Sequence, residues 1–249
     1  MNGYWKGERA GSGTIVWKAR KLLATGEIDE EEFIKIVVDA TTSPGFCNTM
    51  GTATTMNSLA EGLGMSLPGC AAIPAPLSER IEMSYRTGLR IVEMVKKDLT
   101  PSKILTRKAF ENSIVLNSAI GGSTNAPIHI NAIARHVGVE LEIEDWEKVG
   151  LEIPMLVNMQ PGGKYLGEDF HRAGGVPAVM NALLKAGKLH DSAITVNGKT
   201  VAENYAETTT QDTDVIRTFQ NPMLENAGFI VLKGNIFDSA VMKTSVISD

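Results

Sequence analysis

The sequence predicts an α/β protein, and three observations support this fold class. Apolar residues recur at helical spacing in several segments, for example within residues 27–40. A short apolar run at residues 154–159 is typical of a buried strand. Residues 193–201 have the order strand, Asn-Gly turn, strand, which is the pattern of a β-hairpin. We therefore expect a helix-rich α/β domain at residues 1–190 and a strand-rich domain at residues 191–249.

The first two predicted helices flank a Pro-Gly break at residues 42–46. The helix at residues 27–40 carries Asp29 and three glutamates in its first turn, where the positive end of a helix favours negative charge. The second helix, at residues 49–64, is rich in small residues and ends at two glycines.

A proline-punctuated loop is predicted at residues 67–76, before a long helix that runs to about Lys97. Ser78 is a candidate cap for this helix. Its large apolar side chains lie roughly on one face, namely Ile81, Tyr85, Leu89, Val92 and Val95. Further helices are predicted at residues 106–119, 125–137 and 169–186, and further strands at residues 229–232 and 240–246.

Composition indicates an ordinary globular protein rather than a nucleic-acid or membrane protein. The 249 residues carry a net charge of −5 and no basic run, which argues against a nucleic-acid partner. No apolar stretch is long enough to span a membrane, and the N-terminus does not resemble a signal peptide. Two cysteines among eleven methionines favour a reducing compartment, so we expect a cytoplasmic protein.

Cys47 is the strongest candidate for chemistry, because it lies in a Pro-Gly loop just before a predicted helix. A helix N-terminus favours the thiolate, the form of cysteine that binds iron or zinc. The alternative is a buried, inert cysteine, and no Cys-x-x-Cys or His-x-His spacing supports a self-contained metal site. Cys70, after Pro68-Gly69, is better explained as a core or loop thiol.

Two glycine-rich segments are weaker candidates. Residues 121–125, Gly-Gly-Ser-Thr-Asn, precede a predicted helix and could receive a carboxylate or phosphate, which makes Ser123, Thr124 and Asn125 candidate substrate-binding residues. The alternative is a helix cap after a flexible turn. Glycine-rich loops also flank Glu168 and Asp169, and they could carry a carboxylate-binding lysine or a general base. The alternative is that they are turns with solvated charges. The residues alone do not specify a reaction.

Seven motifs taken together resemble the family of dihydroxy-acid dehydratase, phosphogluconate dehydratase and the pentonate (arabinonate and xylonate) dehydratases. They occur in family order along almost the whole chain and are Gly11-Ser-Gly-Thr, Cys47-Asn-Thr-Met-Gly-Thr-Ala, Leu63-Gly-Met-Ser-Leu-Pro-Gly, Ala119-Ile-Gly-Gly-Ser-Thr-Asn-Ala, Gly163-Lys-Tyr, Ala173-Gly-Gly-Val-Pro-Ala-Val and Lys233-Gly-Asn. Residues 68–75 and 195–201 look more like the sugar-acid branch than the branched-chain amino-acid branch.

The resemblance implies an iron–sulfur hydro-lyase that dehydrates a 2,3-dihydroxy (aldonic) acid with the help of Mg²⁺. It assigns Cys47 as the last of three cluster cysteines and favours a [2Fe–2S] over a [4Fe–4S] cluster. It also implies the later part of the family's α/β cluster-binding domain followed by the start of a C-terminal β-barrel. Members are homo-dimers or tetramers, and a eukaryotic member would be mitochondrial.

The chain departs from the family pattern in what it lacks. The other two cluster cysteines, the Mg²⁺ carboxylates, a carbamylated lysine and the base serine have no counterpart in this sequence. We therefore expect an internal fragment of a longer polypeptide, with the base serine beyond residue 249. The alternatives are a dihydroxy-acid dehydratase of branched-chain amino-acid synthesis, and a truncated product or split subunit that has no activity alone.

Overall fold

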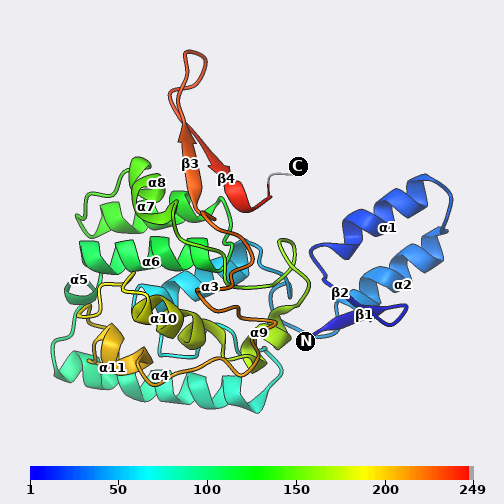
Figure 1. Ribbon diagram of the computed structural model, residues 1–249. Coiled ribbons are helices and arrows are strands. Elements are labelled where there is room, and N and C mark those ends of the chain that lie inside the picture. The colour runs from blue at the N-terminus through cyan, green and yellow to red at the C-terminus, as the bar shows by residue number, and fades with distance from the viewer. Residues whose placement is uncertain (247–249) are drawn as a thin grey trace.

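The computed structural model describes residues 1–246 as a helix-dominated protein with two small antiparallel sheets (Figure 1). This mixture is compatible with the predicted α/β class. The helices are α1 Ile15–Ala24, α2 Glu30–Ala40, α3 Thr52–Gly62, α4 Ser78–Lys96, α5 Pro101–Ile104, α6 Arg107–Ala119, α7 Ala126–His136, α8 Glu144–Gly150, α9 Gly167–Arg172, α10 Gly175–Lys185 and α11 Val201–Tyr205. The strands are β1 Gly3–Trp5, β2 Glu8–Ala10, β3 Phe229–Leu232 and β4 Ala240–Lys243, and a 3₁₀ turn spans Thr244–Val246.

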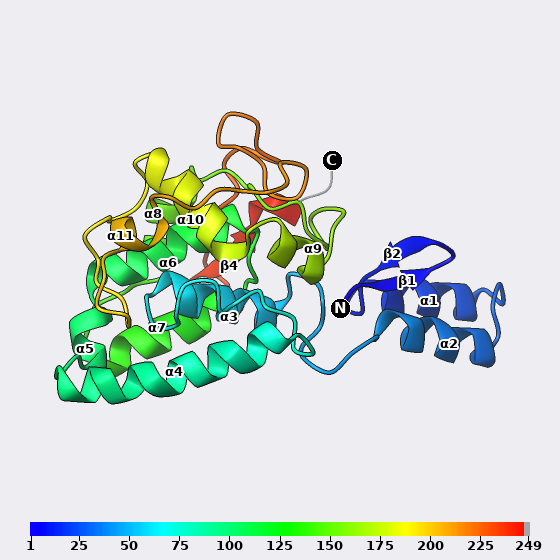
Figure 2. The ribbon, with the colours of Figure 1, turned by 90° about the horizontal axis from the view of Figure 1, so that it is seen from below.

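The first 43 residues form a separate lobe, which we call the N-terminal lobe. It consists of the β1–β2 hairpin and the helix pair α1–α2, and both views show it beside the rest of the chain (Figures 1 and 2). A small core of its own holds it together, formed by Ala10, Ile15, Ala19, Ile28, Ile36 and Ala40. α2 begins as predicted, because the Asp29 side chain accepts a hydrogen bond from the Glu32 N–H at 2.8 Å.

Residues 44–246 form the main body, which is built around α6. Nearly every residue of α6 from Ala109 onward is buried, and the helix contacts α3, α7, α8 and α10. Residues beyond 190 contribute to the same core, among them Val201, Tyr205 and Phe229. The domain boundary near residue 190 stays a prediction.

The long helix predicted at residues 169–186 is interrupted. It forms two helices, α9 and α10, because Gly174 and Gly175 adopt φ values of +115° and +57° between them. Glycine populates this left-handed region at little cost, and a right-handed helix cannot continue through it.

The strand predictions hold only in part. Residues 154–159 are buried and extended, but they make isolated bridges to Leu224, Ile216 and Tyr165 rather than a strand of a sheet. In the predicted hairpin the Asn-Gly turn forms, with Gly198 at φ +80°. The two predicted strands pair only through an isolated antiparallel bridge between Ile194 and Thr200. The second strand cannot continue beyond it, because Thr200 and Glu203 form a capping box that starts α11 at Val201. The strands predicted at residues 229–232 and 240–246 are confirmed as β3 and β4, although β4 ends at Lys243.

Within residues 1–246, no helix combines the length and apolar character that crossing a membrane requires.

Candidate functional site

Cys47 lies in the loop between α2 and α3, five residues before α3 begins. Its thiol is free and half-buried, and the Thr49 hydroxyl donates to Sγ at 3.6 Å. A Cβ added at Gly51, the residue that precedes α3, would lie 3.5 Å from Sγ. The sulfur therefore lies close to the residue that precedes α3.

Backbone hydrogen bonds fix this loop between distant parts of the chain. The Met50 N–H donates to the Gln160 carbonyl at 2.7 Å, and the Gly167 N–H donates to the Asn48 carbonyl at 2.8 Å. On the lobe side, the Asn48 amide oxygen accepts from the Ser12 N–H at 2.8 Å. The loop is thus held by both the N-terminal lobe and the segment that leads into α9.

The Cys47 thiol lines a cavity of about 240 Å³. One wall is the Cys47 loop, and the other is residues 71–75, part of the loop predicted at residues 67–76. Arg80 supplies a positive charge to the lining and Glu168 a negative one. Arg80 also donates to the Ile73 carbonyl, which fixes it against the second wall.

Glu61 of α3 binds the backbone of the loop that forms the second wall of the cavity. Its buried carboxylate accepts the Gly69 N–H at 2.7 Å and the Ala71 N–H at 2.9 Å. Burial raises the pKa of Glu61 to about 7, although the two backbone donors act in the opposite direction. Burial, with a smaller contribution from the Glu61 charge, also raises the pKa of Tyr205, whose hydroxyl is buried without a hydrogen-bond partner.

The candidate residues Ser123 and Asn125 precede α7 and contact Thr52, the first residue of α3. The Ser123 and Thr52 hydroxyls are 3.0 Å apart, and the Asn125 amide donates to the Thr52 hydroxyl at 2.9 Å. Thr124 is exposed. None of the three lines the Cys47 cavity in the described structure, and their role in substrate binding stays a prediction.

Lys243 is a buried residue of this region that sequence reasoning missed. Its ammonium donates to the Gly121 carbonyl at 2.6 Å and so connects β4 to the loop that carries Ser123. Burial lowers the pKa of Lys243 to about 8. The signal in the sequence is a lysine that directly follows the three apolar residues of β4.

Glu168 and Asp169 hold the N-terminal lobe in place. Asp169 accepts two hydrogen bonds from the Arg9 guanidinium, at 2.9 and 3.1 Å, and Glu168 accepts the Asn2 N–H at 2.9 Å. These contacts favour a structural role for Glu168 and Asp169 over the alternative that their charges are simply solvated in a turn. The general-base alternative stays a prediction.

Cys47 fits one ligand position of a metal cluster. Its sulfur borders an open cavity and has the Thr49 hydroxyl beside it. In the part of the chain that the structure describes, no three His, Cys, Asp or Glu side chains gather as a metal site. Cys70 lines a different cavity, with its sulfur 3.5 Å from the Arg80 guanidinium.

Comparison with known proteins places these features in a family. Residues 3–204 match the family described as dihydroxy-acid/6-phosphogluconate dehydratase N-terminal. The whole chain is 55% identical to a D-xylonate dehydratase of Caulobacter vibrioides and 48% identical to an L-arabinonate dehydratase of Rhizobium leguminosarum, and it spans 42% and 43% of their lengths. A dihydroxy-acid dehydratase of Caldanaerobacter subterraneus is 45% identical over 94% of this chain and 42% of its own length. The chain therefore belongs to the dihydroxy-acid/6-phosphogluconate dehydratase family and covers less than half the length of these relatives.

Proposed function

We propose that this chain is part of an iron–sulfur hydro-lyase that dehydrates an aldonic acid, a 2,3-dihydroxy acid, to a 2-keto-3-deoxy acid. The observation that carries the proposal is the 55% identity to a D-xylonate dehydratase along the whole chain. In this reaction the C2 proton and the C3 hydroxyl leave as water, and the resulting enol becomes a ketone.

Cys47 is the residue of this chain that would hold the cluster. Its sulfur borders the cavity and accepts a hydrogen bond from the Thr49 hydroxyl at 3.6 Å, and iron binds cysteine through this atom. When bound, the cluster and a Mg²⁺ ion supply Lewis acids for the departing C3 hydroxyl and for the carboxylate with its C2 hydroxyl.

In this proposal the substrate is bound and oriented by Arg80 of the cavity and by three residues outside its lining, Ser123, Thr124 and Asn125. The Arg80 guanidinium is the charge that suits a substrate carboxylate. The hydroxyl and amide groups of Ser123, Thr124 and Asn125 suit the hydroxyls of a sugar acid. By resemblance to the family, the base that takes the C2 proton is a serine beyond residue 249.

Substrate class is tested by keto-acid formation in the full-length protein that contains this chain. The panel contains D-xylonate, L-arabinonate, hexonates and 2,3-dihydroxyisovalerate. We expect turnover of at least one aldonic acid. Turnover of 2,3-dihydroxyisovalerate alone would favour the second candidate, a dihydroxy-acid dehydratase, which the 45% identity to such an enzyme supports.

The ligand assignment is tested by Cys47→Ser in the same full-length protein. We expect loss of the cluster's visible absorbance together with loss of turnover, because an alcohol is a poor iron ligand at neutral pH. Cys70→Ser is the matched control and should keep both. Unchanged absorbance in Cys47→Ser would remove the assignment.

A rival proposal is that these residues alone are catalytically incomplete. The absence of a three-ligand group among residues 1–246 supports this rival for the isolated chain. Iron and acid-labile sulfide assays decide it: a colourless chain supports the rival, and a full cluster with activity contradicts it. Electron paramagnetic resonance of the reduced full-length protein tests our preference for [2Fe–2S] over [4Fe–4S].

We further propose, from family resemblance, a cytoplasmic homo-dimer or tetramer whose C-terminal β-barrel begins near residue 191. The relatives compared above are bacterial, which favours the cytoplasm over mitochondria. A soluble sugar acid or dihydroxy acid is the expected small-molecule partner.

A further inference from the structure

Glu61 is a buried carboxyl group without a positively charged partner. It lies in the last turn of α3, is 1% exposed, and forms no ion pair with any described lysine, arginine or histidine. Its two oxygens accept one backbone hydrogen bond each, from Gly69 and from Ala71. A carboxyl group without a counter-charge is costly to bury, and carboxyl groups in such settings cluster at functional sites.

The loop that Glu61 binds also binds Arg80, which lies in the first turn of α4. The Arg80 guanidinium donates to the Ile73 carbonyl and lies 3.5 Å from the Cys70 sulfur. Glu61 binds the N–H groups on either side of Cys70. The two side chains thus hold the same five-residue stretch, so a displacement of this loop also displaces the guanidinium.

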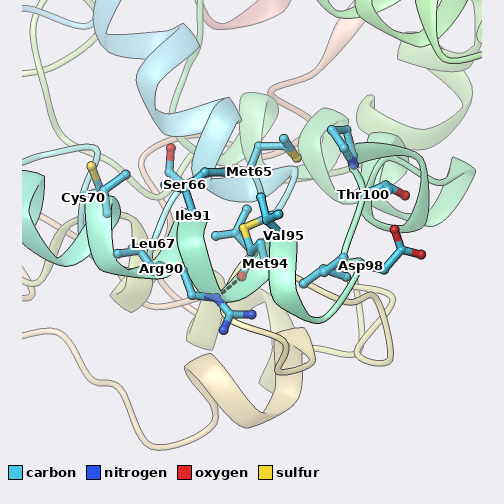
Figure 3. A pocket seen from close by; sticks show the side chains of 14 residues that line it. Met65, Ser66, Leu67, Cys70, Arg90, Ile91, Met94, Val95, Asp98 and Thr100 are labelled. Carbon is cyan, nitrogen blue, oxygen red and sulfur yellow. Dashed lines mark hydrogen bonds between the residues drawn. The ribbon is translucent and has the colours of Figure 1, made fainter.

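Packing confines this loop on one side only. A Cβ added at Gly45 would lie 3.0 Å from the Ala75 Cβ, and one added at Gly175 would lie 3.1 Å from the Ala72 Cβ, so neither neighbour leaves room for a methyl group. On another side Cys70 lines a second cavity, of about 470 Å³ (Figure 3). Because space is open there, packing alone does not hold the loop, and the two bonds to Glu61 keep it in place.

We infer that Glu61 is a positioning residue, which sets the place of the Arg80 guanidinium in the Cys47 cavity by fixing the loop at residues 69–73. The inference rests on the proposed function in one respect, namely that Arg80 binds the substrate carboxylate. α3 begins five residues after Cys47 and carries Glu61 in its last turn. One helix and one short loop therefore determine how far the guanidinium lies from the thiol. A substrate held by its carboxylate at Arg80 is thereby placed relative to Cys47.

The position of Arg80 is tested without turnover, by phenylglyoxal labelling of the full-length protein that contains this chain. Glu61→Gln keeps the shape of the side chain but replaces one acceptor by a donor, so one of the two backbone bonds is lost. We expect phenylglyoxal to modify Arg80 roughly threefold faster in this variant, because the guanidinium loses its fixed contact with the loop. Mass spectrometry of the peptide that contains Arg80 measures the rate.

Asn112→Asp is the matched control. Asn112 is fully buried and, like Glu61, makes two bonds to a backbone, donating to the His190 carbonyl at 3.0 Å and accepting the His190 N–H at 2.7 Å. The substitution keeps the shape of the side chain and removes one of these bonds, and neither residue lines the Cys47 cavity. Arg80 should be labelled at the parent rate. Circular dichroism checks that both variants are folded.

Turnover of an aldonic acid tests the link to the substrate. Glu61→Gln should raise KM roughly three- to tenfold and change kcat less than about twofold, because the contact with the substrate carboxylate weakens. Loss of a negative charge would by itself lower KM for an anionic substrate, so a rise reports the loss of position. In an Arg80→Gln background the same substitution should have no further effect, since both act through one contact.

Failure of this inference and failure of the proposed function give different results. An unchanged labelling rate of Arg80 in Glu61→Gln, or an equal acceleration in Asn112→Asp, would overturn the inference. So would a parent-like KM in Glu61→Gln, or fully additive effects, where Arg80→Gln itself raises KM. If Arg80→Gln leaves KM unchanged, the substrate role of Arg80 in the proposed function fails, and the labelling rate alone decides whether Glu61 positions this residue.

Discussion

The N-terminal lobe and the main body are stabilised in different ways. The main body has a large core with fully buried aromatic side chains, such as Phe110 and Trp146. The core of the lobe contains only alanine and isoleucine, with Trp5 and Phe33 partly buried against it. Burial of apolar area therefore determines the geometry of the main body far more than that of the lobe.

The attachment of the lobe to the main body is polar. Arg9 binds Asp169 with two hydrogen bonds, Asn2 binds Glu168, and Ser12 binds Asn48. Charge-assisted bonds of this kind are directional and sensitive to salt. Cys47 lies where the two regions meet, so its position depends on both the apolar core and this polar contact.

The largest effect is expected from a cavity in the main body. Phe110→Ala should lower the free energy of unfolding by about 3–5 kcal/mol, because Phe110 is fully buried in α6. Urea unfolding followed by circular dichroism measures this. Ile128→Ala, at a site that is 68% exposed, should cost no more than about 0.5 kcal/mol. Equal losses in the two variants would show that burial of Phe110 does not stabilise the main body.

A pH effect of similar size is expected in the main body. Glu61 has a pKa of about 7 in the folded chain against its usual 4.5. Between these values the folded state keeps a proton that the unfolded state has lost, so the free energy of unfolding falls as pH rises through this window. The fall is on the order of 3 kcal/mol.

Glu61→Gln tests this dependence. The variant loses one acceptor for the N–H groups of Gly69 and Ala71, so it is less stable than the parent chain, but its stability no longer falls between pH 4.5 and 7. The exposed Glu207→Gln is the control and should keep the slope. A parent chain with the same slope as Glu61→Gln would show that burial does not raise this pKa.

The smallest effect is expected where the lobe meets the main body. Arg9→Ala should cost about 1–3 kcal/mol, the range for hydrogen bonds to charged groups, and the loss should shrink at high salt. Hydrogen exchange should quicken in the lobe while α6 stays protected. Lys6→Ala removes the exposed Lys6–Glu32 pair inside the lobe and should change little. Faster exchange in α6 of Arg9→Ala would mean that the two regions unfold together.

Local signals in the sequence predicted the helices well. Asp29 with its acidic first turn predicted α2, because the cap and the turn it stabilises are adjacent in sequence. Local signals misled at residues 193–201. Thr200, near the end of the predicted second strand, forms a capping box with Glu203 and starts a helix. The exposed face of α4, from Ile81 to Val95, shows that periodicity identifies an apolar face but not what covers it.

The candidate site was predictable only in part. Cys47 at a helix start came from its local setting and the family motifs, whereas its contacts with residues 160–167 join segments more than 100 positions apart. Glu61 and Lys243 belong to no motif, and their importance comes from burial that only tertiary structure creates. The Ser123–Thr52 contact likewise depends on how α3 and α6 are arranged.

The bonds that fix the Cys47 loop also have a consequence for the order of events during synthesis. The loop receives its final bonds from Gln160 and Gly167, which leave the ribosome long after Cys47. We therefore predict that the thiol of a nascent chain reacts freely with maleimide until residue 167 has emerged, and that its reactivity then falls. Constant reactivity in stalled chains of increasing length would refute this prediction. Insertion of a metal cluster would accordingly follow, rather than precede, the closing of this loop.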